Sequence, residues 1–281
     1  MSISYPKKEH DSFFLILLAL LLSLTTPPVC AKPTVEPPFR RGEYLEYQVY
    51  YSIVHAGTAI MSVDEALHEI DNRTCYKIDV QGISNDALAL CGFKVKDTWE
   101  TYLDVEQLRP RKFLAHIQEN NYVRKECIDF DYKKNQARIE VLENTPDAKP
   151  EISYYPIPDA IKDLVSGYYA LRSIDIKRLK PGDALRISVL HENKMYPDVS
   201  IQFLGKRTIA TKLGKISSLV FAPMVPTENS IFAGERPVEI FISDDVNKIP
   251  LKLKANLVLG AVEIELSNYK GLKAAIPFQK P

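Results

Sequence analysis

Hydrophobic and polar residues alternate along most of the chain from residue 43 onward, a pattern typical of β-strands that bury one face. In the segment 43–54, Leu45, Tyr47 and Val49 alternate with polar side chains. After residue 184, similar runs recur at a spacing of about ten residues, as in all-β sandwiches and barrels. About a dozen such strands would twist and curl instead of staying flat. We therefore predict a mainly β fold with a large, strongly curved antiparallel sheet, resembling an open barrel or a sandwich.

One stretch departs from this alternation and predicts a single central α-helix at 158–173. Its apolar residues recur with the 3.6-residue period of an amphipathic helix; they are Ile161, Leu164, Val165, Tyr168 and Leu171. Pro158 and Asp159 suit a helix start, because proline needs no N–H there and aspartate accepts an unpaired N–H. We expect the helix to lie on, or plug, the sheet with Tyr168 and Leu171 toward it.

The last two predicted strands also indicate a register. A turn at Leu259–Gly260 would place Ala255 opposite Ile264 and Lys254 opposite Glu265, which keeps one face apolar and pairs opposite charges on the other. Leucine disfavours the positive φ of a tight turn, so a slightly wider loop is the alternative.

The N-terminus has the pattern of a secretory signal peptide. Two lysines precede an unbroken apolar run at 13–22, and small residues follow up to Ala31. The run is shorter than the roughly 20 residues that span a bilayer, so we predict a signal peptide at 1–31 that is cleaved after Ala31. A retained anchor and a lipoprotein modified at Cys30 are alternatives. The protein is thus expected to be exported, and periplasmic or envelope-associated.

Beyond the signal peptide, the chain divides into a linker at 32–42, a single antiparallel β domain at 43–270 and a C-terminal tail at 271–281. No later stretch is apolar enough to predict a transmembrane segment. The formal net charge is 0, with both signs interspersed. A neutral chain of this kind does not indicate a nucleic-acid partner.

The candidates for chemistry are few. After signal cleavage Cys75, Cys91 and Cys127 remain, and their number allows one disulfide or none. The histidines have no metal-ligand spacing and no C-x-x-C motif occurs, so we predict no metal and no cofactor. No nucleophile elbow, phosphate loop or dinucleotide fingerprint is present, and we therefore predict no catalytic residues. An enzyme would need a polar cluster in a cleft, formed for example by Glu100, Glu119, Asp244 and His116.

Aromatic residues on the predicted strands suggest a ligand pocket. Aromatic side chains dominate the lining of many apolar and carbohydrate sites, although tyrosine on strands is also ordinary core composition. The residues that we expect to bind a ligand are Tyr47, Tyr51, Trp99, Phe113, Tyr168 and Leu171.

Eight short motifs follow one another along the chain: Gly42–Tyr47, Ala56–Ala59, Asp97–Asp104, Asp163–Arg172, Pro181–Asp183, Phe241–Asp245, Ile249–Pro250 and Leu259–Gly260. In this arrangement the chain resembles a family of bacterial envelope proteins, domain-of-unknown-function family 3108. The resemblance covers nearly the whole chain after the signal peptide. It implies export and a β-rich fold, and it supplies no catalytic residues.

These observations favour a non-enzymatic envelope protein that binds an apolar or amphipathic molecule such as a lipid, a lipoprotein or a polymer. The alternatives are a structural or assembly factor that holds another envelope protein, and an envelope hydrolase.

Overall fold

The computed structural model describes residues 36–90, 92–145, 148–224 and 232–279. In this part of the chain fifteen strands form one sheet in the order β8-β7-β6-β5-β4-β3-β2-β1-β15-β14-β13-β12-β11-β10-β9. The strands are β1 (Tyr44–Tyr51), β2 (Val54–Ile70), β3 (Arg73–Ser84), β4 (Lys96–Asp104), β5 (Pro110–Glu119), β6 (Tyr122–Asp131), β7 (Gln136–Glu143), β8 (Glu151–Pro156), β9 (Ile161–Lys162), β10 (Ala184–His191), β11 (Lys194–Thr211), β12 (Gly214–Pro223), β13 (Val238–Ser243), β14 (Pro250–Asn256) and β15 (Ala261–Lys270). Neighbours are antiparallel except β9 and β10, which are parallel.

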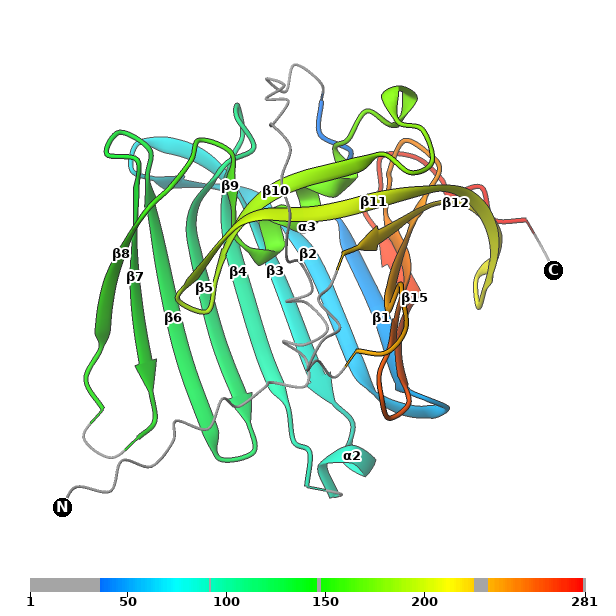
Figure 1. Ribbon diagram of the computed structural model, residues 1–281, viewed down its shortest axis with the longest axis horizontal. Coiled ribbons are helices and arrows are strands. Elements are labelled where there is room, and N and C mark those ends of the chain that lie inside the picture. Colours follow the sequence, from blue (N-terminus) through cyan, green and yellow to red (C-terminus); the bar gives the residue numbers. More distant parts are fainter. Residues whose placement is uncertain (1–35, 91, 146–147, 225–231, 280–281) are drawn as a thin grey trace.

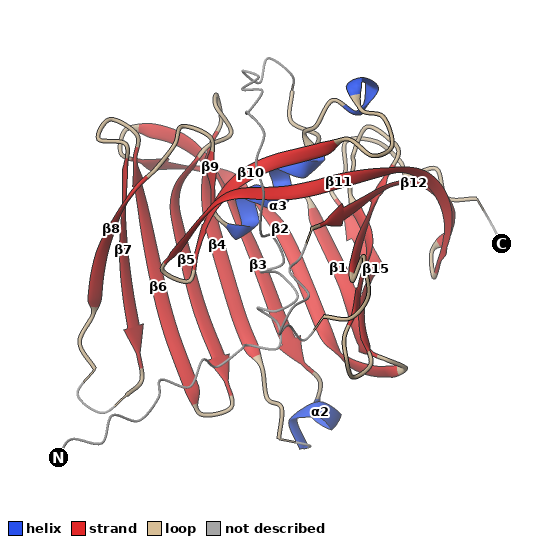
Figure 2. Ribbon diagram, in the orientation of Figure 1, coloured by secondary structure: helices blue, strands red, loops and turns tan. Residues whose placement is uncertain are grey.

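The sheet curls over itself without closing. Strands β10 and β11 cross over the strands in the middle of the sheet, and helix α3 (Leu164–Arg172) lies between these two layers (Figures 1 and 2). Strands β8 and β9 are the two edges of the sheet and follow one another in the chain. Side chains of β8 reach the β10–β11 turn, where the Tyr155 hydroxyl donates to the Asn193 carbonyl oxygen at 2.6 Å. The predicted curved antiparallel sheet with a central helix is confirmed.

Bulges help to produce the curl, because a bulge bends its strand and increases the local twist. Strand β11 changes register between Phe203 and Gly205, and Gly205 has a φ of +104°. Strand β2 changes register between Val63 and Leu67. Both are long strands, so a bend in each redirects a large part of the sheet.

Helix α3 begins later than predicted. Residues 158–162 are not helical, and they include the short strand β9. The start is fixed by a capping box, in which the Ser166 N–H donates to the Asp163 carboxylate at 2.8 Å and the Asp163 N–H donates to Ser166 Oγ at 2.9 Å. Thr101 Oγ1 on β4 also donates to the Asp163 carboxylate at 2.6 Å. This contact with the sheet sets the first turn, and the periodicity of apolar residues does not reveal it.

The buried side of α3 differs slightly from the predicted one. Leu171 is buried as expected, whereas Tyr168 is half-buried and its neighbour Tyr169 is almost completely buried. The Tyr169 ring packs edge-on against the Phe39 ring, with 4.9 Å between centroids. Packing against Phe39, which precedes β1, therefore places Tyr169 instead of Tyr168 on the buried side of the helix.

A buried ion pair anchors the C-terminal end of α3. Arg172 is 0 % exposed and Glu43 is 1 % exposed, and the guanidinium donates to both carboxylate oxygens at 2.6 and 2.9 Å. It also donates to the carbonyl oxygens of Asn247 and Lys248 at 3.0 and 3.1 Å. The helix is thus joined to the start of β1 and to the β13–β14 turn.

Parts of the predicted linker and tail contact the domain. Phe39 is buried in the core, and the backbone of Gln279 pairs with that of Lys215 at 2.8 and 3.0 Å. The predicted signal peptide, with Cys30 and Ala31, lies outside the described residues.

The predicted register of the last hairpin was wrong by two residues. Lys254 lies opposite Glu263 instead of Glu265. The loop is wider than the predicted turn, with a hydrogen bond of 3.0 Å from the Leu257 N–H to the Gly260 carbonyl oxygen and a φ of +84° at Gly260. A shift of two keeps every side chain on its predicted face, so the alternation alone does not reveal it.

The described cysteines are free thiols. Cys75 is buried and Cys127 is partly buried. Burial raises the pKa of Cys75 to about 11, so this thiol is protonated and unreactive at neutral pH. Cys91 lies outside the described residues.

The first prediction concerns the Arg172–Glu43 pair. Arg172→Met should destabilise the protein by about 3–5 kcal/mol, because it leaves the Glu43 carboxylate buried without a partner. Arg172→Met combined with Glu43→Leu should be more stable than the single variant, because no isolated charge remains. Urea unfolding gives the free energy of unfolding of both variants. A double variant that is no more stable than Arg172→Met would contradict this account of the pair.

The second prediction concerns the packing of α3 on the sheet. Leu171→Ala should lower the free energy of unfolding by about 2–5 kcal/mol, as truncations in a packed core do. Thermal and urea unfolding test it. An unchanged stability would mean that α3 does not pack on the sheet as described.

Candidate functional site

The inner face of the sheet carries polar groups where the core would be expected to be apolar. Strand pairing aligns Tyr47 on β1, Ala59 on β2, Gly82 on β3 and Asp97 on β4. The neighbouring row aligns Trp99, Ala115 and Glu126. We call these seven residues the interior site.

Alternation explains why the polar members of the interior site face inward. On β6, Arg124 and Glu126 have the same parity as Ile128 and Phe130, and all four are buried. On β4, Asp97 has the same parity as the buried Trp99. These carboxylates and this guanidinium therefore occupy positions that would hold core residues on an ordinary strand.

Four buried polar atoms of the interior site have no hydrogen-bond partner among the described residues. They are Tyr47 OH, Trp99 Nε1, Asp97 Oδ2 and Glu126 Oε1. Most buried polar atoms in proteins are paired, and leaving one unpaired costs about 1–3 kcal/mol. From α3, the buried Tyr169 hydroxyl adds a fifth such atom. The inner face thus combines aromatic rings with unpaired donors and acceptors.

Asp97 is the member of the interior site that changes charge near neutral pH. Burial raises the pKa of its carboxyl to about 7, and the nearby Glu119 carboxyl acts in the same direction. The Gln118 N–H donates to Asp97 Oδ1 at 2.8 Å, which opposes the rise.

A buried charged cluster adjoins the interior site at the end of β10. Arg124 Nη1 lies 2.6 Å from Glu126 Oε2, with both side chains buried. His191 is buried too, and neither of its ring nitrogens has a partner within the described ranges. Burial, together with the charge of Arg124, lowers the pKa of His191 to about 3. His191 is therefore neutral at physiological pH, and the cluster can offer both a donor and an acceptor.

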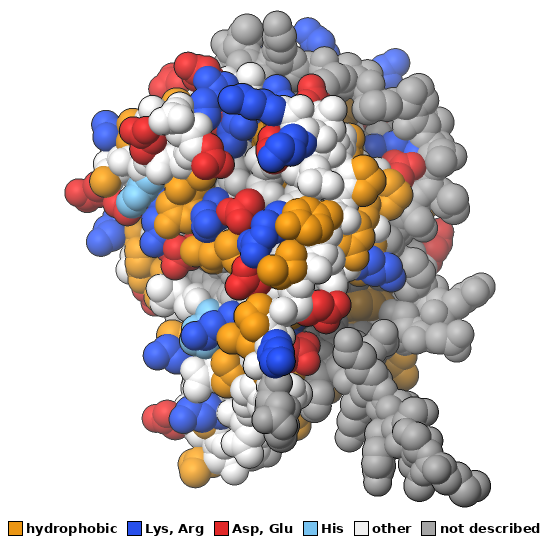
Figure 3. All heavy atoms as spheres, turned by 90° about the vertical axis from the view of Figure 1, so that its left-hand side faces the viewer, with side chains coloured by type: hydrophobic (Ala, Val, Ile, Leu, Met, Phe, Trp, Pro, Cys, Tyr) orange, Lys and Arg blue, Asp and Glu red, His pale blue; other side chains and the backbone are white. Residues whose placement is uncertain are grey.

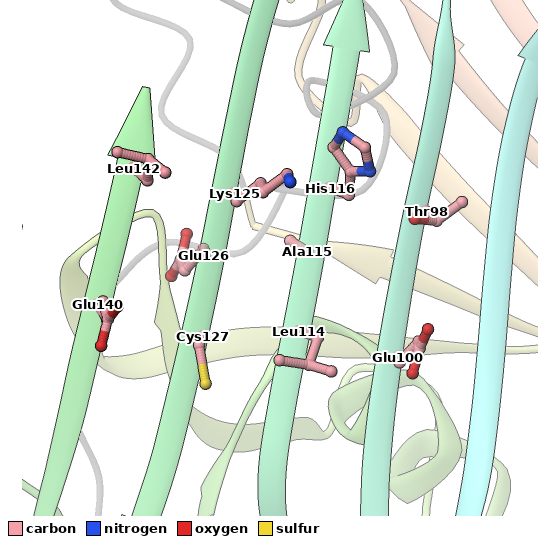
Figure 4. A pocket seen from close by; sticks show the side chains of 10 residues that line it. All are labelled: Thr98, Glu100, Leu114, Ala115, His116, Lys125, Glu126, Cys127, Glu140 and Leu142. Atoms are coloured by element: carbon pink, nitrogen blue, oxygen red, sulfur yellow. The ribbon is translucent and has the colours of Figure 1, made fainter. Parts of the chain in front are cut away.

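A shallow depression of about 380 Å³ lies on the outer face of β4–β7, and its lining includes Ala115 and Glu126 of the interior site (Figure 4). Its floor includes Leu114 and Leu142, and Lys125 and His116 project beside them. The side of the molecule that carries β7 and β8 likewise mixes apolar and charged side chains (Figure 3).

The predicted ligand-binding residues do not all lie together. Four of them, Tyr47, Trp99, Phe113 and Leu171, are buried in the core, and Tyr168 packs against it. Tyr51 instead lies at the end of β1, where its hydroxyl donates to the Leu259 carbonyl oxygen at 2.6 Å. Ligand contact by these residues stays a prediction. Sequence reasoning missed Asp97, Arg124, Glu126 and His191, although the inward parity of the first three was a usable signal.

The residues named for a hydrolase do not converge. Glu100 and His116 line the outer depression, whereas Glu119 lies beside Asp97. Asp244 lies in the β13–β14 turn and pairs with Lys206 at 2.7 Å. Within the described ranges no three His, Cys, Asp or Glu side chains are placed to hold a metal ion. A search of the same residues for helices long and apolar enough to span a membrane found none.

The third prediction uses Asp97. Its pKa is higher in the folded state than the value of about 3.9 for an unfolded chain, so the folded state holds a proton that the unfolded state has lost. Stability should therefore fall as the pH rises from 4 to 7 and level off above. Asp97→Asn keeps the acceptor for Gln118 and removes the charge, so it should raise the free energy of unfolding at pH 8 by up to about 4 kcal/mol, at about 1.4 kcal/mol per pKa unit. The gain should vanish toward pH 4, and urea titrations across this range test it. A gain independent of pH would contradict the assignment.

The chain was compared with known families and structures. The family model described as "Protein of unknown function (DUF3108)" matches residues 46–267. A search of curated proteins found no match. The crystal structure of a beta-barrel-like protein of domain of unknown function DUF1849 from Brucella abortus has a TM-score of 0.51 at 7% identity, covering 84% of this chain and 99% of that chain.

Two more distant structures also match. One is a candidate exported protein with a YmcC-like fold from Bacteroides fragilis, with a TM-score of 0.31 and 11% identity over 83% of this chain and 97% of that chain. The other is a candidate lipoprotein from Parabacteroides distasonis, with a TM-score of 0.31 and 11% identity over 84% and 99% of the two chains. The Brucella abortus structure shows the likeness of fold, and the family match, over most of the chain, shows that this protein belongs to the DUF3108 family.

Proposed function

We propose that this protein is an exported envelope protein that binds an apolar or amphipathic molecule inside its curled sheet and catalyses no reaction. The ligand class is a lipid, a lipoprotein or a polymer. The observation that carries the proposal is the set of four unpaired buried polar atoms beside the aromatic and aliphatic side chains of the inner face.

The chemistry of the interior site suits an amphipathic ligand. Its aromatic and aliphatic side chains would pack against an apolar chain, as in most small-molecule sites. The Tyr47 hydroxyl and the Trp99 N–H are donors without a described partner, and they would hold a carbonyl or ester oxygen. Half-buried Ala59 and buried Gly82, between Tyr47 and Asp97, are the smallest side chains in the row and would allow close approach of the ligand.

The open edge of the sheet offers a route to the interior. Strands β8 and β9 are both edges, and β8 contacts the β10–β11 turn through side chains, which include Ser153 and Tyr155. Such contacts can separate at lower cost than a continuous ladder of backbone hydrogen bonds. Export is supported by the signal-peptide pattern of residues 1–31.

The fourth prediction exploits the single tryptophan of the chain, Trp99, which belongs to the interior site. A fatty acid brominated near the middle of its chain should quench the fluorescence of Trp99, and the quenching should saturate at a stoichiometric amount of the fatty acid. Ala59→Phe fills the row beside Gly82 and should weaken quenching at least about tenfold. Ile60→Phe, the adjacent position on the outer face, is the matched control and should bind like the unmodified protein.

Mass spectrometry of the purified protein gives an independent readout. A co-extracted lipid, lost in Ala59→Phe and kept in Ile60→Phe, is the expected result. An absence of both bound lipid and Trp99 quenching, with the two variants equally folded, would refute interior binding.

Exposed apolar side chains on edge strand β8 favour a second function, the holding of another envelope protein. Strand β8 pairs with β7 along one side only, and its Ile152 and Tyr154 are exposed. Strands with a free edge can add a strand from a partner. Crosslinking in cells from position 152 or 154 separates the two functions, because a reproducible protein partner without bound lipid would favour the assembly role.

A further inference from the structure

We propose that one end of the sheet docks on the surface of an anionic phospholipid bilayer. The surface consists of six apolar side chains in three neighbouring turns, and we call it the apolar rim. Its members are Ile53, Val54, Leu90, Phe93, Val258 and Leu259. The proposal goes beyond interior ligand binding and does not depend on it.

The apolar rim is exposed to an unusual degree. Ile53 is 94 % exposed, Leu90 is 89 % exposed and Leu259 is 78 % exposed. Single exposed apolar residues are normal on protein surfaces. Six of them gathered in three turns are not, because such clusters mark sites of interaction with a partner or a membrane.

The three turns are linked by hydrogen bonds near their bases, so they are neighbours at one end of the sheet. The Ser52 N–H in the β1–β2 turn donates to the Ala261 carbonyl oxygen at 2.6 Å, beside the β14–β15 turn. Asn85 Nδ2, which precedes helix α2 (Asp86–Leu90), donates to the His55 carbonyl oxygen at 2.5 Å. Figure 1 shows α2 and the β1–β2 turn at the same end of the sheet.

The opposite end of the sheet has a different character. Because neighbouring strands are antiparallel, the β2–β3 and β6–β7 turns lie at that end. They carry Asp71 and Asn72, and Lys133 and Lys134. Val246 in the β13–β14 turn is an exposed apolar residue there, and it stands among Asp244, Asp245, Asn247 and Lys248. Leu67, near the end of β2, is also exposed there. Exposed apolar residues are thus scattered at this end, whereas the apolar rim gathers six of them in neighbouring turns.

The charges beside the apolar rim favour a bilayer over a protein partner. Lys94 and Lys96, one and three residues after Phe93, are both exposed. Asp86 is the exposed acidic residue of the same connection. Lysines that flank projecting apolar side chains are typical of interfacial binding, in which the apolar groups enter the acyl boundary and the cations meet lipid phosphates. The side chains of the apolar rim project from separate turns, a geometry that suits insertion between lipids.

The test is flotation of the purified protein with vesicles of phosphatidylethanolamine and phosphatidylglycerol. Cys30 is replaced by Ala throughout, so that no acyl chain can be attached there. Ile53→Asp combined with Leu259→Asp should reduce the vesicle-bound fraction at least about tenfold, because both side chains would have to carry a charge into the bilayer. Val246→Asp, at the opposite end, is the matched control and should float like the parent. Lys94→Glu with Lys96→Glu should weaken binding to these vesicles and leave any binding to pure phosphatidylcholine vesicles unchanged.

Circular dichroism and thermal unfolding establish that each variant is folded. The proposal is overturned if the parent does not float, or if the apolar-rim variant and Val246→Asp float equally. Concentration-dependent dimerisation that the apolar-rim variant abolishes, without flotation of the parent, would assign the surface to a second copy of the chain instead. Quenching of Trp99 by a brominated fatty acid is measured in parallel, so a failure of docking and a failure of interior binding remain distinguishable.

Discussion

The structure depends on a buried arginine at the end of its main helix. Arg172 holds Glu43 and two carbonyl oxygens of the β13–β14 turn, while its guanidinium lies 4.9 Å from the centroid of the Tyr169 ring. Burial of such a pair does not by itself stabilise a protein, since desolvation offsets the attraction. What it provides is specificity, because each group is costly unless the others are in place. The ion pair thus fixes where α3 lies between the two layers of the sheet.

The position of α3 divides the inner face into two regions. Near Thr101, which donates to the cap of the helix, α3 covers the face, and the Tyr169 hydroxyl is the unpaired polar atom that α3 itself contributes. The rows through Asp97, Trp99 and Glu126 carry unpaired polar atoms, and the pKa of Asp97 is raised to about 7. A protein that needed this region only for stability would gain from apolar residues there. Their retention is the physical basis for the proposal of interior binding.

The two proposed surfaces have complementary chemistry. The interior site combines aromatic side chains with unpaired donors and acceptors, which suits a single amphipathic molecule. The apolar rim presents Ile53, Leu90 and Leu259 at the tips of turns with lysines beside them, which suits an extended lipid surface. Strand β1 leads from Tyr47 in the interior to the β1–β2 turn in the apolar rim. A molecule taken from a bilayer would therefore be bound near the end that meets the bilayer.

The sequence alone determined most of the strands, the alternation of their faces, the central helix and the family resemblance, because alternation, turn residues and capping are local properties. It did not predict the edge strand β8, in a segment rich in proline. It did not reveal that residues 158–162 form a turn and the short strand β9 instead of helix, since the capping contact from Thr101 comes from a distant strand. Nor did it reveal the hairpin register at Lys254, because a shift of two preserves both faces. Tertiary structure alone decided that Glu126 lies in one row with Trp99 and that the turns carrying Ile53, Leu90 and Leu259 lie at the same end of the sheet. These arrangements arise because strands far apart in the chain pair and the sheet curls. A local sequence pattern carries no information about such long-range contacts.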